Sequence, residues 1–113
     1  EVDFLDATSK RLRRRGFEVR VATHCGEALP EVSSGWPDVV VLDVMLPDVD
    51  GMECLRRMKS AAPRLPVVML TAHASIQSGL DGIELGASDY CLKPIELDAL
   101  VEKIRIAQKD ATG

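Results

Sequence analysis

Residues 39–43 read Val39-Val40-Val41-Leu42-Asp43, four apolar residues followed at once by a carboxylate. A run that is apolar on both faces is typical of a central strand in a parallel sheet that has helices on either side. Pro66-Val67-Val68-Met69-Leu70 repeats the pattern and ends in Thr71, and the shorter Tyr90-Cys91-Leu92 ends in Lys93. Segments with helical spacing of apolar residues separate these runs. The sequence therefore predicts a doubly wound α/β fold with a parallel sheet.

Periodicity and capping signals predict further elements. Apolar and charged residues alternate in Phe17-Glu18-Val19-Arg20-Val21, which predicts a strand with one solvent-exposed face. A helix is predicted over about residues 24–34, with a kink or a late start caused by Pro30. Asp50 and Glu53 stand three residues apart before another helix, which is the spacing of an acidic cap and its capping-box partner.

Length and composition favour one domain, predicted to span residues 1–113. The hydrophobic fraction of 46% is enough for a single core. A net charge of −4 argues against direct binding of nucleic acid or of a membrane surface. No run approaches the roughly 20 apolar residues that cross a bilayer, and the first residues lack the features of a signal peptide. We therefore predict a cytoplasmic protein.

The cysteines are three in number and widely spaced, and none forms a Cys-x-x-Cys pair. Disulfide frameworks and zinc sites usually have paired or closer spacing. Cys25, Cys54 and Cys91 are therefore predicted to be small buried apolar residues without a bond between them.

Three polar residues end three successive apolar runs: Asp43, Thr71 and Lys93. Because the carboxyl ends of parallel strands meet at one edge of a sheet, these side chains are expected to converge. A carboxylate can attack phosphorus, a lysine can neutralise a phosphoryl oxygen, and a hydroxyl can donate a hydrogen bond to another oxygen. This combination predicts a site for phosphoryl transfer, a reaction that usually involves magnesium.

Three segments resemble the receiver domains of bacterial two-component response regulators. Residues 39–51 resemble the phosphorylation-site segment of that family, residues 67–73 the switch-threonine segment, and residues 86–94 the aromatic-switch and lysine segment. The resemblance extends from residue 1 to about residue 107. It implies a flavodoxin-like fold with strand order 2-1-3-4-5.

The resemblance also implies a function. A sensor histidine kinase or a phosphotransfer protein would donate a phosphoryl group to Asp43. The receiver would catalyse its own phosphorylation and dephosphorylation and would not be an enzyme with a separate substrate. Lys93 would bind the phosphoryl group, and a cis peptide between Lys93 and Pro94 would aim its ammonium group.

The implied switch couples two further residues to the site. Thr71, with Ala72 beside it, would move towards the phosphoryl group, and Tyr90 would change rotamer. The surface formed by the fourth helix, the fifth strand and the fifth helix would change with them and control an output. By the same resemblance, a homodimer could form through this surface.

The sequence departs from the family at its start. Receivers begin with a strand that ends in an acidic pair holding Mg²⁺. Here the sequence starts beyond that point, so we expect that strand and its turn, about ten residues, to be missing and the domain to be N-terminally incomplete. An incompletely given chain, a truncation and a rearranged assembly all stay open. The first two are favoured, because an open gap at the centre of a parallel sheet is unstable.

The magnesium site is correspondingly incomplete. By resemblance, the chain supplies the Asp43 carboxylate and the backbone carbonyl of Met45, fewer oxygens than the octahedron that Mg²⁺ prefers. Asp48, Asp50 and Glu53 could substitute for the acidic pair, but helix capping and solvent contact are the favoured roles.

Two other functions lack residues that they require. A phosphatase of the haloacid-dehalogenase type needs an aspartate two residues after the nucleophile, where this chain has Met45. A dinucleotide binder needs a Gly-x-Gly-x-x-Gly loop, which does not occur. The alternative that remains is a receiver-like interaction module that works without phosphorylation. The absent acidic pair favours it, and the Asp43, Thr71 and Lys93 set argues against it.

Overall fold

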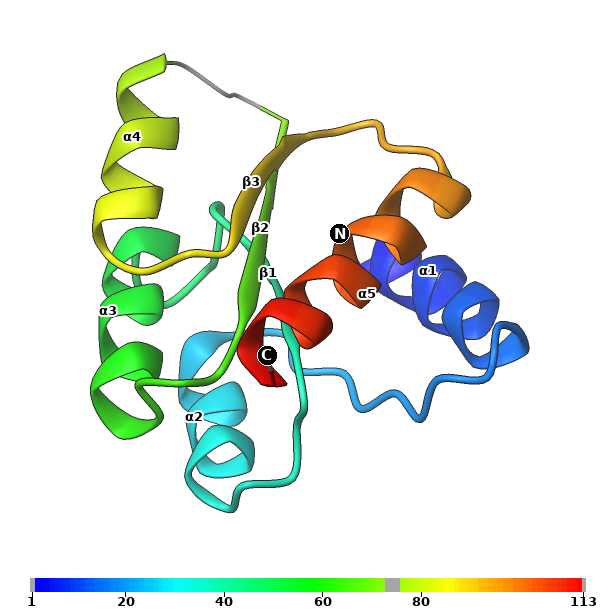
Figure 1. Ribbon diagram of the computed structural model, residues 1–113, viewed down its shortest axis with the longest axis horizontal. Helices are drawn as coiled ribbons and strands as arrows, with labels where there is room; N and C mark the ends of the chain where they lie inside the picture. The colour runs from blue at the N-terminus through cyan, green and yellow to red at the C-terminus, as the bar shows by residue number, and fades with distance from the viewer. Residues whose placement is uncertain (1, 73–75, 113) are drawn as a thin grey trace.

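A parallel sheet lies at the centre of the structure, a computed structural model that describes residues 2–72 and 76–112. Helices pack on both of its faces, as Figure 1 shows. The elements follow in the order α1 (Val2–Arg14), α2 (Cys25–Ser33), β1 (Val40–Asp43), α3 (Gly51–Ala61), β2 (Val67–Thr71), α4 (Ile76–Glu84), β3 (Asp89–Leu92) and α5 (Leu97–Thr112).

The strands form one sheet in the order β1-β2-β3, and both neighbouring pairs are parallel. Val41 lies opposite Val68 in the first pair, and Met69 lies opposite Tyr90 in the second. This order corresponds to the last three strands of the expected 2-1-3-4-5 sheet. The predicted α/β class with a parallel sheet is confirmed.

The strand β2 separates two hydrophobic cores, and all five of its residues are buried. Val67 and Met69 face one core, in which α2 and α3 cover the sheet. Val68 and Leu70 face the other, which is covered by α1 and α5. In Figure 1 these helix pairs lie on opposite sides of the strands. The period of two along a strand explains why a continuous apolar run marks a strand covered on both faces.

The predicted strand at Phe17–Val21 is wrong, because these residues form an irregular extended segment. A cavity of about 900 Å³ lies beside them, and its lining includes Val19 and Val21 from the segment and Val41 from β1. In the described parts of the chain, β1 pairs with β2 and with no strand on its other edge. Alternation of side chains is a local property, whereas a strand also needs a neighbour for its backbone hydrogen bonds.

The helix caps and helix starts predicted from the sequence agree only in part with those in the structure. Asp50 caps α3 as predicted, since its side chain accepts a hydrogen bond from the backbone N–H of Met52 at 2.7 Å. Glu53 does not close a capping box, because its carboxylate pairs with Arg56 and Arg57 instead. The helix α2 begins at Cys25 and continues through Pro30, so the late start is not observed.

A disulfide joins Cys25 of α2 to Cys54 of α3, which corrects the prediction of unbonded cysteines at these positions. The helices pack side by side and bring the two Cα atoms to 5.9 Å, within the usual range for a disulfide. Cys91 is a buried free cysteine, and burial raises the pKa of its thiol. No helix in the described ranges has both the length and the apolar character that a membrane span requires.

Candidate functional site

The three predicted polar residues meet at the carboxyl edge of the sheet. Asp43 is the last residue of β1, Thr71 is the last residue of β2, and Lys93 directly follows β3. The backbone N–H of Lys93 donates to the carbonyl oxygen of Thr71 at 2.7 Å, which fixes the start of the loop after β3. The peptide between Lys93 and Pro94 is cis, the form that the family resemblance implies.

Lys93 and Asp43 form the central contact of the site. The Lys93 Nζ lies 2.5 Å from the Asp43 Oδ2, and the side chains are 12% and 20% exposed. An ion pair this shielded from solvent is weakly screened by salt. The ring of Phe4 in α1 lies 4.2 Å below the same Nζ, a cation–π contact that the sequence did not predict.

Thr71 is 1% exposed and sits on the strand between the other two. The loop after β1 starts with backbone contacts that turn it away from the sheet. The N–H of Val44 donates to the Leu70 carbonyl at 3.1 Å, and the N–H of Met45 donates to the Asp43 Oδ1 at 2.9 Å. The Met45 side chain is 63% exposed.

Gly51 closes this loop against its own beginning. Its N–H donates to the Val44 carbonyl at 2.9 Å. A Cβ at this position would lie 2.4 Å from the Val44 Cα and 2.8 Å from the Asp43 carbonyl oxygen. The backbone therefore approaches too closely for any side chain, which explains a glycine here.

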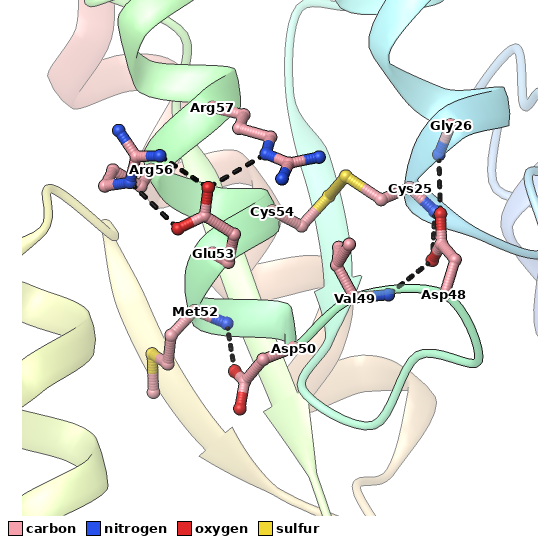
Figure 2. Close-up of a disulfide and its surroundings, with 10 residues drawn as sticks. All are labelled: Cys25, Gly26, Asp48, Val49, Asp50, Met52, Glu53, Cys54, Arg56 and Arg57. Carbon is pink, nitrogen blue, oxygen red and sulfur yellow. Dashed lines mark hydrogen bonds and ion pairs between the residues drawn. A yellow bond between two sulfur atoms is a disulfide. The ribbon is translucent and has the colours of Figure 1, made fainter.

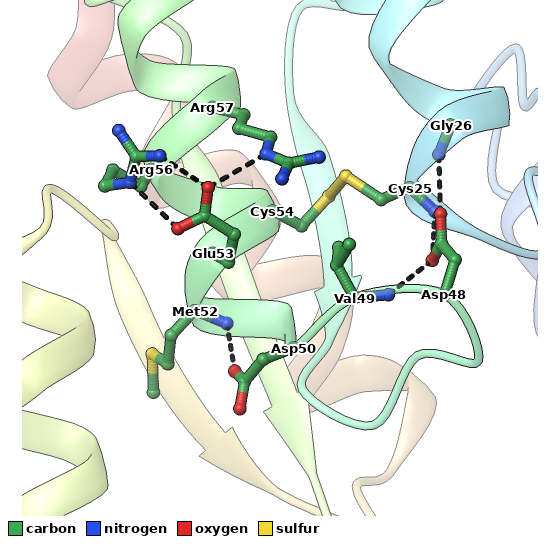
Figure 3. Close-up of polar contacts among 10 residues, drawn as sticks. All are labelled: Cys25, Gly26, Asp48, Val49, Asp50, Met52, Glu53, Cys54, Arg56 and Arg57. Carbon is green, nitrogen blue, oxygen red and sulfur yellow. Dashed lines mark hydrogen bonds and ion pairs between the residues drawn. A yellow bond between two sulfur atoms is a disulfide. The ribbon is translucent and has the colours of Figure 1, made fainter.

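The acidic loop residues have structural partners, which Figure 3 shows. Asp48 accepts hydrogen bonds from the N–H groups of Cys25 and Gly26, both at 3.0 Å, and from that of Val49 at 2.9 Å. These backbone donors, those of Gly26 and Cys25 above all, lower the pKa of Asp48 to about 2. Asp48 thus caps the start of α2, a role that its distance in sequence from α2 concealed.

The described residues do not by themselves complete a magnesium site. They contain no cluster of three or more His, Cys, Asp or Glu side chains that could hold a metal ion. Of the two predicted ligands, Asp43 already contacts Lys93, and Met45 offers one backbone carbonyl. Asp48 and Asp50 are occupied as caps of α2 and α3. One carboxylate and one carbonyl fall short of the six oxygens that Mg²⁺ prefers.

Tyr90 belongs to β3 and its ring faces α4, with its hydroxyl buried and without a hydrogen-bond partner in the described structure. A Cβ at Gly82 of α4 would lie 3.2 Å from the Tyr90 ring, and one at Gly79 would lie 3.6 Å from it. Two glycines thus make the space that the ring occupies. Ala72 is exposed, and His73, which ended the predicted switch segment, lies outside the described residues.

The surface formed by α4, β3 and α5 carries exposed apolar side chains. Leu80 and Ile83 of α4 are 57% and 51% exposed, Leu92 of β3 is 55% exposed and Ile106 of α5 is 51% exposed. An ion pair of 2.9 Å between Lys103 of α5 and Asp89 of β3 joins two of these elements. Each of the three elements thus exposes at least one large apolar side chain.

Comparison with known proteins gives a consistent family. The model of the response regulator receiver domain matches residues 1–105. The chain is 43% identical over 94 residues to the transcriptional regulatory protein TrcR of Mycobacterium tuberculosis, an alignment covering 83% of this chain and 37% of TrcR. It is 38% identical over 115 residues to the response regulator MprA of Mycolicibacterium vanbaalenii, covering 98% of this chain and 50% of MprA. The chain thus spans half or less of the length of these relatives.

Solved structures agree with this assignment. The fold resembles that of a response regulator receiver domain protein (CheY-like) from Methanospirillum hungatei with a TM-score of 0.93 and 28% sequence identity. The match covers 99% of this chain and 90% of that protein. The flavodoxin-like receiver fold expected from the sequence is therefore confirmed.

Proposed function

The chain belongs to the response regulator receiver family of two-component signalling, and from this premise we propose that Asp43 accepts a phosphoryl group from a sensor histidine kinase or a phosphotransfer protein. The observation that carries the proposal is the 2.5 Å contact between the Lys93 Nζ and the Asp43 Oδ2. It places an ammonium group beside the carboxylate that ends β1. Phosphoryl transfer depends mainly on such positioning and charge stabilisation.

In the proposed reaction, an oxygen of the Asp43 carboxylate attacks phosphorus. The bond between phosphorus and the donor's histidine nitrogen breaks, and that nitrogen keeps the electron pair and takes up a proton. The product is an acyl phosphate on Asp43. Lys93 then pairs with a phosphoryl oxygen, and the Thr71 hydroxyl donates to another. Hydrolysis of the acyl phosphate by water restores the carboxylate, so the domain catalyses its own cycle and needs no separate substrate.

The proposed output is a change of the surface formed by α4, β3 and α5. When Thr71 moves towards the phosphoryl group, Tyr90 changes rotamer and the apolar side chains around it are rearranged. The buried hydroxyl without a partner is consistent with an aromatic residue that has a second position, since an unsatisfied buried hydroxyl is costly. We place the protein in the cytoplasm, with a second copy of the chain as one partner for this surface and no direct contact with nucleic acid or membrane.

The test is intact mass after incubation of the chain with a small phosphoryl donor, with and without magnesium. One phosphoryl adduct is expected on the parent chain and none on Asp43→Asn. Asp38→Asn is the matched control, because it makes the same change at an exposed carboxylate outside the cavity lining.

The outcomes separate the two candidate functions. An adduct on the parent and on Asp38→Asn but not on Asp43→Asn supports phosphorylation of Asp43, and its dependence on magnesium shows whether an ion takes part. An adduct that survives Asp43→Asn places the phosphoryl group elsewhere and refutes the site. The absence of any adduct, with magnesium and without it, both on this chain and on one extended at the N-terminus by a first strand, favours the interaction module.

A further inference from the structure

The Cys25–Cys54 disulfide joins the two helices that also hold the loop after Asp43 (Figure 2). The loop spans residues 44–50, between β1 and α3. Near its end, the Asp48 carboxylate binds the N–H groups of Cys25 and Gly26 at the start of α2. Asp50 caps α3, and the Cys54 N–H donates to the Asp50 carbonyl at 3.0 Å. The covalent bond therefore ties together both supports of the phosphorylation-site loop.

The support from α2 depends strongly on this bond. One side of α2 packs on α3, and Cys25 and Val32 are its buried residues. Among the described helices and strands, α2 packs chiefly on α3, so loss of the bond between these two helices is expected to lower the local stability of α2.

The two cysteines are both buried, at 1% and 0% exposed, so exchange with a small reagent requires local opening. Cys25 is the first residue of α2, whereas Cys54 lies inside α3. Fraying at the start of α2 therefore exposes the Cys25 sulfur first. Cys91 belongs to the core on the other face of the sheet, so it cannot exchange with either member of the pair without unfolding.

We propose that Cys25 and Cys54 form a reversible redox site that controls the order of the 44–50 loop and, through it, the rate at which Asp43 accepts a phosphoryl group. Disulfides in a reducing compartment are usually catalytic or redox-sensing, which fits a bond of this kind in a cytoplasmic receiver. The second half of the proposal rests on the proposed function, and the first half does not.

The oxidant is a low-molecular-weight disulfide such as that of glutathione. The Cys25 thiolate attacks one sulfur of the oxidant, and one small thiolate leaves, giving a mixed disulfide on Cys25. The Cys54 thiolate then attacks the Cys25 sulfur, and the second small thiolate leaves. The protein loses two protons and two electrons, which the oxidant gains as two small thiols. Reduction follows the same steps in reverse.

The first experiment equilibrates the chain with glutathione buffers of graded ratio, then denatures and alkylates it. The reduced chain has three alkylated cysteines and the oxidised chain one, which is Cys91. A reversible transition within cytosolic glutathione ratios is expected. A bond that stays intact throughout would identify a permanent structural disulfide, and a pair that never joins would refute the bond. Either result overturns the proposal.

The second experiment measures amide hydrogen exchange on the oxidised and reduced chains. Reduction is expected to speed exchange at least several-fold in residues 44–50 and at the start of α2, while β2 and α5 keep their protection. Cys25→Ser, which leaves only the fully buried Cys54 of the pair, should match the reduced chain under all buffers, and Cys91→Ser should still switch. Equal exchange in both redox states would refute control of the loop, whatever happens at Asp43.

The third readout is the rate of phosphoryl adduct formation, which is expected to be several-fold slower in the reduced form. Equal rates in both forms would refute the link to Asp43 and leave the phosphoacceptor function intact. No adduct in either form would refute the phosphoacceptor function, and the exchange experiment would still decide whether the redox site controls the loop. The failures of the two proposals are therefore distinguishable.

Discussion

Gly51→Ala is expected to destabilise the domain at the loop beside Asp43. The added Cβ would lie 2.4 Å from the Val44 Cα, 2.6 Å from the Val44 carbonyl oxygen and 2.8 Å from the Asp43 carbonyl oxygen. All three neighbours are backbone atoms, so rotation of a side chain cannot relieve the contact. The backbone of the loop must move away from α3.

The size of the effect follows from two contributions. Overpacking of a buried position costs about 1–3 kcal/mol. Moving the loop also weakens the 2.9 Å hydrogen bond from the Gly51 N–H to the Val44 carbonyl, worth about 1 kcal/mol. The free energy of unfolding should fall by about 2–4 kcal/mol in total, which lowers the Tm by on the order of 10–20 °C in a domain of this size.

Urea unfolding followed by the fluorescence of Trp36, the single tryptophan, measures this change. Gly26→Ala is the matched control, because a Cβ there would meet the His24 and Asp48 side chains at ordinary distances of 3.5 and 3.7 Å. Alanine also has the higher helix propensity, so the control should gain up to about 1 kcal/mol. A Gly51→Ala chain as stable as the parent would refute the close approach of the loop to α3.

Three further changes test the site and its surroundings. Lys93→Gln should slow formation of the phosphoryl adduct by about 10²-fold, because it removes the charge beside Asp43, and timed mass spectra measure the rate. Gly82→Ala should displace the ring of Tyr90, whose Cδ2 would lie 3.2 Å from the new Cβ, and the NMR signal of this single tyrosine should shift. Asp48→Asn should be less stable than the parent at neutral pH. Because the folded pKa of Asp48 is about 2 and its ordinary value is 3.8, that difference should disappear as pH falls from 3.8 to about 2.

Each of these predictions has a control variant or an outcome that would contradict it. Lys10→Gln, at an exposed helix position, should leave the adduct rate unchanged, and equal rates for both lysine variants would argue against a role for Lys93. Gly79→Ala, whose Cβ would lie an ordinary 3.6 Å from the Tyr90 ring, should shift the tyrosine signal less than Gly82→Ala. A stability difference between Asp48→Asn and the parent that persists at pH 2 would show that its cause is not the ionised carboxylate.

The sequence predicted those parts of the fold that depend on the local order of apolar and polar side chains along the chain. Doubly apolar runs located β1 and β2 to within one residue. In β2, burial on both faces leaves no room for polar side chains. The convergence of Asp43, Thr71 and Lys93 followed from parallel strands having their carboxyl ends at one edge. Asp50 was predictable as a cap because a cap acts within its own helix.

The features that the sequence did not reveal depend on contacts between distant segments. Residues 17–21 alternate correctly for a strand, but pairing requires a neighbour that pattern alone does not supply. Cys25 and Cys54 are 29 residues apart, and their pairing arises only from the packing of α2 on α3. Glu53 had the spacing of a capping box, yet two arginines on its own helix compete for the carboxylate.

The complete burial of β2 has a practical consequence for protein engineering. Residues 67–71 supply both cores at once, so a substitution at any of these positions perturbs the packing on one face or the other. A combinatorial library for this domain should therefore keep the strand fixed. Arg11 and Arg14 on α1 are exposed and offer positions where diversity costs little. A screen designed in this way would vary surface positions that can contact a binding partner and would leave the buried strand unchanged, so that the variants stay folded.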